Sequence, residues 1–152
     1  MTNFQNRTQL PHYDSAKDQV FAELRVAGAN RYDMKLPETY YMPTVIKADE
    51  HVMAAVYGKY ELGRGVLVAT DSRVLFIDRK PLFVRCDEIG FGMIGGVSHS
   101  RVTLAAILTM HTRLGAYKLR TFNHKAVKNF VDYIDQVCLQ TLRKEIHYDF
   151  TT

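Results

Sequence analysis

The sequence predicts a mainly β domain: a seven-stranded antiparallel barrel or sandwich, capped by a C-terminal helix and preceded by an extra N-terminal helix. Three observations support this fold class. Short runs rich in aliphatic, β-branched and aromatic residues recur between residues 52 and 122, with turn residues between them. Residues 124–145 carry apolar side chains at helical spacing. Residues 63–83 form a hairpin pattern that is apolar on both faces.

This hairpin is the centre of the predicted fold. Two aliphatic runs flank a polar break at Asp71 and Ser72. A hairpin with one face in water alternates apolar and polar residues, whereas here both alternating sets are mostly apolar. We therefore expect the barrel core to cover one face, and the N-terminal segment or a neighbouring subunit to cover the other.

The N-terminal part is predicted to contain one helix. Residues 1–13 are polar and lack periodicity, which indicates a flexible leader. Asp14 or Ser15 can cap a helix that runs to about Ala27 and stops at Gly28.

The apolar stripe of this helix is suited to packing on a sheet or on a partner subunit. Its members include Val20, Phe21 and Leu24, which are the candidate assembly residues. Residues 30–43 are interrupted by Pro37 and Pro43, so we expect a connector without regular structure.

Strands are predicted at residues 52–61, in the hairpin, and at residues 82–86, 89–98, 102–111 and 117–122. Gly58 is expected to mark a bulge or bend. The glycines of residues 89–98 favour a coiled strand over a phosphate loop, because no Gly-Lys-Ser/Thr follows them. In the strand predicted at residues 102–111, one face is expected to lie in the core. This face comprises Val102, Leu104, Ala106, Leu108 and Met110.

The closing helix is expected to be capped by Asn123 and to end near Glu145. The chain therefore divides into a leader (1–13), an N-terminal helix and connector (14–48), the main domain (49–146) and a tail (147–152).

Composition places the chain among globular proteins, with 152 residues of which 47% are hydrophobic and 24% charged. It has neither an apolar run of the roughly 20 residues that span a bilayer nor a secretory signal, so we expect a cytoplasmic protein. Cys86 and Cys138 match no metal or disulfide pattern and are expected to be reduced thiols in or near the core.

The charge distribution is uneven. The net charge is +4, and residues 89–131 contain no Asp or Glu. An anionic partner or membrane surface would suit this span, and a solvated basic face is the alternative. Nucleic acid is the less expected partner because no outward aromatic platform accompanies the cations. The candidate anion- or lipid-binding residues are Arg113, Lys118, Arg120, Lys125 and Lys128.

No catalytic constellation stands out in the sequence. The candidates are residues 98–100 (Ser-His-Ser) and His111, and neither has an acidic residue nearby in the chain. The six His and two Cys residues match no metal-ligand spacing. We therefore expect no enzymatic activity, no metal and no cofactor.

Residues 50–138 resemble the bacterial pleckstrin-homology-like domains of the YokE-like family. The resemblance rests on the G-x-L-x-A-T-[DN]-x-R-x-L-F-x-D run at residues 65–78, the strand that leads to residues 87–89 (Asp-Glu-Ile) and the FVDYI stretch at residues 130–134. It implies a seven-stranded bent barrel capped by a C-terminal helix, and an interaction module that often assembles into rings. Phosphoinositide binders of the eukaryotic branch carry a Lys near the end of the first strand and an Arg-x-Arg-like pair on the second. Here Lys59 and Arg64 lie nearby, but the second strand, residues 65–70, has no basic residue and departs from that pattern.

Taken with the resemblance, the sequence predicts a non-enzymatic module that binds a protein partner or assembles into a homo-oligomer. The alternative is peripheral binding to anionic membrane lipid, or to another anionic ligand, through the basic residues named above.

Overall fold

The computed structural model describes residues 16–151, with side chains described to residue 147. The predicted leader and the helix cap at residues 14 and 15 lie outside this range. The helical elements are α1 (Ala16–Val26), the short 3-10 helices η2 (Asp33–Lys35) and η3 (Phe91–Met93), α2 (Pro37–Val45) and α3 (His124–Thr151). The strands are β1 (Val52–Tyr60), β2 (Gly63–Thr70), β3 (Val74–Arg79), β4 (Val84–Ile89), β5 (Ile94–Val102), β6 (Ala105–Thr112) and β7 (Gly115–Thr121).

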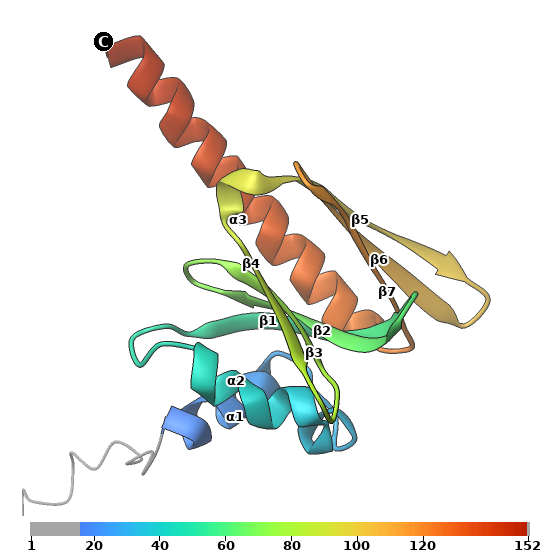
Figure 1. The fold of residues 1–152 in the computed structure, drawn as a ribbon. Helices are drawn as coiled ribbons and strands as arrows, with labels where there is room; N and C mark the ends of the chain where they lie inside the picture. The colour runs from blue at the N-terminus through green and yellow to red at the C-terminus, as the bar shows by residue number, and fades with distance from the viewer. Residues whose placement is uncertain (1–15, 152) are drawn as a thin grey trace, which may run out of the picture.

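All seven strands belong to one antiparallel sheet, in the order β4-β3-β2-β1-β7-β6-β5. The sheet has two halves, β1–β4 and β5–β7, which meet where Lys59 of β1 pairs with Arg120 of β7. The halves are inclined to each other, and the first part of α3 runs between them (Figure 1). This arrangement confirms the predicted fold class of a bent antiparallel sheet closed by a C-terminal helix.

The two-sided burial of the β2–β3 hairpin is also confirmed. Leu67 and Phe76 point into the core that α3 closes, whereas Val68 and Leu75 point into a second core under α1 and α2. Figure 1 shows α1 and α2 on the face of β1–β3 that lies away from α3. The second face is therefore covered by the N-terminal segment of the same chain.

Helix α1 forms as expected and ends at Gly28, which has a φ of 108° and so adopts the left-handed conformation that glycine favours. Val20 and Leu24 are 4% and 0% exposed, and Phe21 packs edge-on against Tyr40. This stripe packs against the domain's own sheet and α2. The role of Val20, Phe21 and Leu24 in self-association stays a prediction.

The prediction of an irregular connector at residues 30–43 is wrong, because this stretch contains η2 and most of α2. Pro37 lies in the first helical turn, where a backbone N–H needs no partner within the helix. Pro43 lies in the last turn and costs the helix one hydrogen bond. Packing compensates for that loss: Met42 is fully buried, and the Thr39 hydroxyl donates to the Asp33 carbonyl at 2.6 Å.

The second half of the sheet differs from prediction at its turns. The chain reverses at residues 103 and 104, where Thr103 has a φ of 53°. Val102 therefore ends β5, and Val102 and Leu104 are exposed, although both were expected in the core. Ala106, Leu108 and Met110 are buried as predicted. The apolar run of residues 102–111 masks this turn because it lacks the glycine or asparagine that usually occupies a left-handed position.

Helix α3 begins as predicted and extends further than predicted. Asn123 caps it, since its side-chain oxygen accepts a hydrogen bond from the Ala126 N–H at 3.1 Å. The helix continues to Thr151, so the expected tail at residues 147–152 is helical up to residue 151, and this end projects beyond the sheet (Figure 1). Within the described residues, no helix has the length and apolar character needed to cross a membrane.

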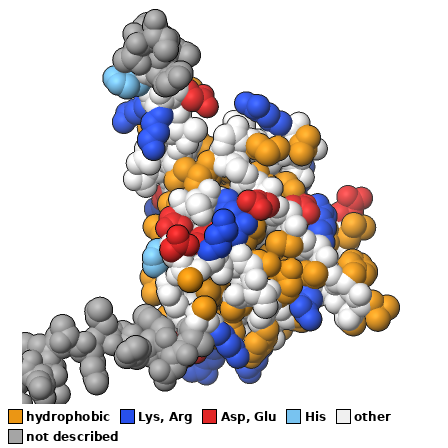
Figure 2. Space-filling model, turned by 60° about the vertical axis from the view of Figure 1, so that its left-hand side comes forward, with side chains coloured by type: hydrophobic (Ala, Val, Ile, Leu, Met, Phe, Trp, Pro, Cys, Tyr) orange, Lys and Arg blue, Asp and Glu red, His pale blue; other side chains and the backbone are white. Residues whose placement is uncertain are grey.

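An ion pair fixes the turn of the central hairpin. The Glu50 carboxylate accepts hydrogen bonds from the hydroxyls of Thr70 at 2.6 Å and Ser72 at 3.0 Å, and from Arg73 Nε at 2.9 Å. Arg73 also donates to the Val45 carbonyl at 2.8 Å, which connects the turn to the end of α2. Figure 2 shows acidic and basic side chains lying together on one face of the molecule.

Glu50 is 4% exposed, so its charge depends on these partners. Burial alone raises the pKa of Glu50, but the hydrogen bonds from Arg73, Thr70, Lys47 and Ser72 outweigh it and lower the pKa to about 2. A carboxylate with a lowered folded-state pKa stabilises the fold above its unfolded pKa, and this stabilisation is lost as the pH falls toward the folded value.

We expect Glu50→Gln to lower the free energy of unfolding at pH 7 by about 3 kcal/mol, because Arg73 loses its buried counter-charge. The deficit should narrow as the pH falls from about 4.5 toward 2, since the wild-type carboxylate is then protonated too. Urea unfolding at pH 7 and at low pH measures both effects. Glu61→Gln, at an exposed position, is the matched control. A deficit independent of pH would contradict the assigned role of the charge.

Candidate functional site

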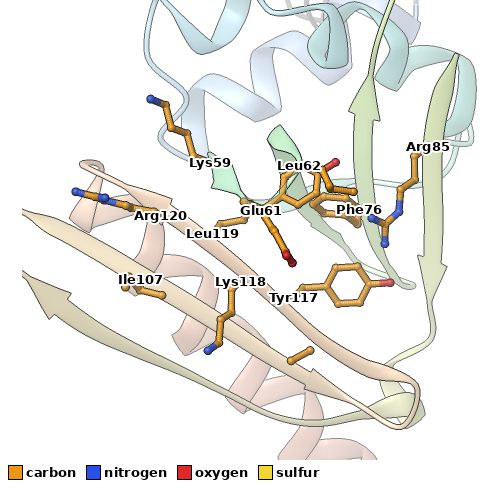
Figure 3. Close-up of a pocket in the computed structure, with 12 residues that line it drawn as sticks. Lys59, Glu61, Leu62, Phe76, Arg85, Ile107, Tyr117, Lys118, Leu119 and Arg120 are labelled. Atoms are coloured by element: carbon orange, nitrogen blue, oxygen red, sulfur yellow. The ribbon is translucent and has the colours of Figure 1, made fainter. Parts of the chain in front are cut away.

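The candidate site is a groove of about 750 Å³ at the corner where the two halves of the sheet meet. Its walls come from the end of β1 and the turn that follows, from β3, β4 and β6, and from β7 (Figure 3). The lining residues are Lys59, Tyr60, Glu61, Leu62, Phe76, Arg85, Ile107, Ala116, Tyr117, Lys118, Leu119 and Arg120.

The groove exists because β1 and β7 meet and then separate. At Gly58 the strands are so close that a Cβ atom would lie 2.7 Å from the Arg120 carbonyl oxygen. Strands β1 and β7 pair at Lys59 and Arg120. Just past Lys59 the chain turns into β2, whereas the part of β7 that precedes Arg120 pairs with β6. In the described chain, no strand pairs with the β1-facing edge of β7 from Gly115 to Lys118.

Gly58 was expected to mark a bulge or bend in β1. Its pairing with Gly65 is regular, and the irregularity in the β1–β2 register lies between Val52 and Ala54. The bulge prediction is therefore wrong. Gly58 instead provides the space for the backbone of β7.

The floor of the groove is aromatic. Phe76 packs edge-on against Tyr60, with ring centroids 5.2 Å apart. It packs in a tilted arrangement against Tyr117, with ring centroids 5.3 Å apart. Gly65 makes room for the Phe76 ring, because a Cβ atom there would lie 2.8 Å from it. Beside these rings, Leu119 is fully buried.

Both groove tyrosines are held by carboxylates, that of Asp78 buried and that of Asp87 half-buried. The Tyr60 hydroxyl donates to Asp78, and the Tyr117 hydroxyl donates to Asp87 at 2.8 Å. Burial is the main cause that raises the pKa of Tyr60 to about 12, and its bond to Asp78 adds to the effect. The pKa of Tyr117 is raised for the same two kinds of reason. At neutral pH these phenols are protonated donors whose hydrogens are already committed.

Arg85 lies over the aromatic floor, with its guanidinium carbon 4.9 Å from the Phe76 ring centroid and 6.0 Å from that of Tyr117. It also donates to Asp87 through two nitrogens, the shorter bond being 2.7 Å. Burial raises the pKa of Asp87, but hydrogen bonds from Arg85 and Tyr117 outweigh this and lower it. The charge of Arg85 is therefore balanced within the groove wall.

Three other cations on the rim are not balanced in this way. Lys59, Lys118 and Arg120 are exposed, and within the described chain none has an ion pair. Glu61 is the one carboxylate among the lining residues. The rim of the groove therefore carries an excess of positive charge.

The structure brings together two of the five predicted anion-binding residues. Lys118 and Arg120 both line the groove. The alternation of residues along β7 predicted that both side chains point outward. The other three do not line it: Arg113 is in the β6–β7 turn, and Lys125 and Lys128 are exposed on α3.

Sequence reasoning missed Lys59 and Arg85 as members of the same site, because both precede the acid-free span. The nearest signal was the position of Lys59 at the end of the first strand, although only the pairing of β1 with β7 places it beside Arg120.

The residues considered for catalysis do not gather into a site. His99 and His111 are exposed on neighbouring strands, where they pair with Leu108 and Gly96. Within the described chain, no group of three or more His, Cys, Asp or Glu side chains could hold a metal ion. Cys138 is partly buried as expected, but Cys86 is exposed, because β4 is an edge strand.

Comparison with known proteins gives a family match. A family model described as a bacterial PH domain matches residues 46–136, which is more than half of the chain. Among solved structures, the chain is similar to a DUF1696 family protein with a pleckstrin-homology domain from Shewanella loihica PV-4, with 16% sequence identity and a TM-score of 0.47. That match covers 65% of this chain and 91% of the other. No match is found among the curated proteins.

We expect Gly58→Ala to lower the free energy of unfolding by about 2 kcal/mol, because the added methyl group would press on the Arg120 carbonyl. Gly96→Ala is the matched control in another strand, since nothing lies within 4 Å of the added atom. Its effect should stay within about 0.5 kcal/mol. Urea unfolding of both variants tests the expectation, and equal effects would show that β1 and β7 are not closely packed at Gly58.

Proposed function

Since the chain belongs to the bacterial PH domain family, we propose that it is a non-enzymatic interaction module that binds a protein partner in the groove between β1 and β7. Domains of the PH-like type generally mediate binding interactions. The observation that carries the proposal is the free edge of β7, which lies between an aromatic floor and a cationic rim. The narrower resemblance to the YokE-like family stays a prediction.

The chemistry of the groove supports binding over catalysis. A general base or nucleophile needs a free lone pair near neutral pH. The hydroxyls of Tyr60 and Tyr117 both donate to carboxylates, and the pKa of each is raised. Arg85 is bound by Asp87. Apart from the exposed carboxylate of Glu61, what remains available is apolar surface and positive charge, the combination found in binding sites with an apolar centre and a polar rim.

A photocrosslinker in the groove tests the proposal. Ala116 is exposed within the groove, and Ser100 is exposed on β5, outside it. With p-benzoylphenylalanine at position 116, we expect a discrete protein adduct in the native cells that is absent when the crosslinker is at position 100. Lys118→Glu with Arg120→Glu should abolish the adduct, because the rim charge is reversed. An adduct of twice the chain mass would identify the partner as a second copy.

No adduct at position 116, or the same adducts from both positions, would contradict the groove as a protein-binding site.

The second candidate function is attachment to an anionic membrane surface, and a specific observation favours it. Leu62, Leu82 and Phe83 are 73%, 96% and 65% exposed in the β1–β2 and β3–β4 turns. The turns are adjacent, since Lys80 Nζ lies 2.6 Å from where a Cβ atom of Gly63 would be. Exposed apolar tips beside cations suit insertion into a headgroup layer.

Vesicle sedimentation tests this alternative. If it holds, vesicles of phosphatidylserine and phosphatidylcholine should sediment the protein at low salt and release it at high salt. Leu82→Asp with Phe83→Asp should abolish sedimentation but leave the crosslinked protein adduct unchanged. Pure phosphatidylcholine vesicles are the control. The absence of binding to the anionic vesicles would remove the membrane alternative.

A further inference from the structure

We infer that the partner supplies an extended segment with alternating acidic and apolar residues, and that this segment adds to the free edge of β7 as a further strand. The inference rests on the proposed function of the groove. It goes beyond that function by stating the conformation of the ligand and its sequence pattern.

The backbone of β7 provides the first argument. Beyond the Lys59–Arg120 pair, the β1-facing edge of β7 has no strand partner in the described chain, although its other edge pairs continuously with β6. Unpaired strand edges accept extended peptides through main-chain hydrogen bonds. The groove beside this edge is open along residues 116–120, so an added strand can approach it.

The alternation of side chains along β7 provides the second argument. Lys118 is exposed on the outer face, whereas Tyr117 and Leu119 face the interior. Residues directly opposite one another on neighbouring strands share a face. A residue opposite Lys118 therefore lies beside exposed cations, with Glu61 as the one carboxylate among the lining residues. A residue opposite Tyr117 lies against the aromatic floor. An added strand matches both environments when it alternates acidic with apolar residues.

The spacing of the rim cations provides the third argument. Lys118 and Arg120 are two residues apart on β7, which separates them by about 7 Å along the strand. Lys59 lies directly across from Arg120. This row of charges does not converge on one point, as a site for a small anion would. It suits carboxylates spaced along an extended chain.

The probe for this inference is the capped peptide acetyl-Glu-Val-Glu-Val-Glu-Val-Glu-amide, titrated by calorimetry into the full-length protein. We expect saturable binding that weakens by about tenfold or more when the same residues are rearranged into an acidic block and an apolar block. Lys118→Glu with Arg120→Glu should weaken binding to a similar degree. Arg101→Glu with Arg143→Glu reverses two exposed charges outside the groove, on β5 and α3, and is the matched charge control.

Backbone methylation separates strand addition from attraction of charge alone. Alternate amides of a strand point to opposite edges, so methylating the three Val amides blocks one edge, and methylating the internal Glu amides blocks the other. Strand addition requires that one of these two peptides loses binding while the other keeps it. Equal binding by both methylated peptides, or no binding of the parent peptide, would overturn the inference.

The outcome remains separable from the proposed function. A protein adduct at position 116 together with a failed peptide test leaves the groove as a protein site but refutes strand addition. Failure of both experiments refutes both proposals. If phosphatidylserine vesicles displace the parent, rearranged and methylated peptides equally well, the surface recognises negative charge and not an extended backbone. That result would also overturn strand addition.

Discussion

The burial of the β2–β3 hairpin on both faces is the constraint on which the rest of the structure depends. Leu67 and Phe76 need one cover, and Val68 and Leu75 need another. Helix α3 and the strands β5–β7 provide the first cover, and α1 with α2 provide the second. The buried pair of Glu50 and Arg73 then fixes the turn between the strands and connects it to the end of α2. Both covering layers are therefore positioned by the burial of the two apolar faces of the hairpin, whose exposure to water is unfavourable.

The same sheet must also bend, and its bend creates the candidate site. Two antiparallel strands can meet at a corner only where their backbones approach closely, which the missing side chain of Gly58 allows. Beyond that point β1 pairs with β2 and β7 pairs with β6, so one edge of β7 has no strand partner among the described residues. The phenols at the floor donate hydrogen bonds to Asp78 and Asp87, and Arg85 is paired with Asp87. The rim cations have no ion pair within the described chain. A ligand that supplies backbone hydrogen bonds, apolar side chains and carboxylates would complete all three features.

A structural feature could be predicted from the sequence when it depends on residues that are adjacent in the chain. The alternation of β7 was enough to place Lys118 and Arg120 outside, and Asn123 was enough to locate the start of α3, because side-chain direction and capping depend on adjacent residues. Reasoning from local signals failed at Pro37 and Pro43, which are tolerated within α2 because tertiary packing of Met42 and Thr39 offsets the hydrogen bond lost at Pro43. It failed again at Thr103, where a tight turn forms without glycine or asparagine.

The sequence by itself determined that the domain is a mainly antiparallel β fold with a closing helix, and that its central hairpin is buried on both sides. Periodicity carries this information because the spacing of apolar residues sets which faces leave water. Only the tertiary structure decided that the N-terminal segment of the same chain covers the second face. It alone also placed Lys59 beside Arg120, although 61 positions separate them in the sequence. No local pattern specifies such a pairing, because it results from the packing of the whole sheet around its two cores.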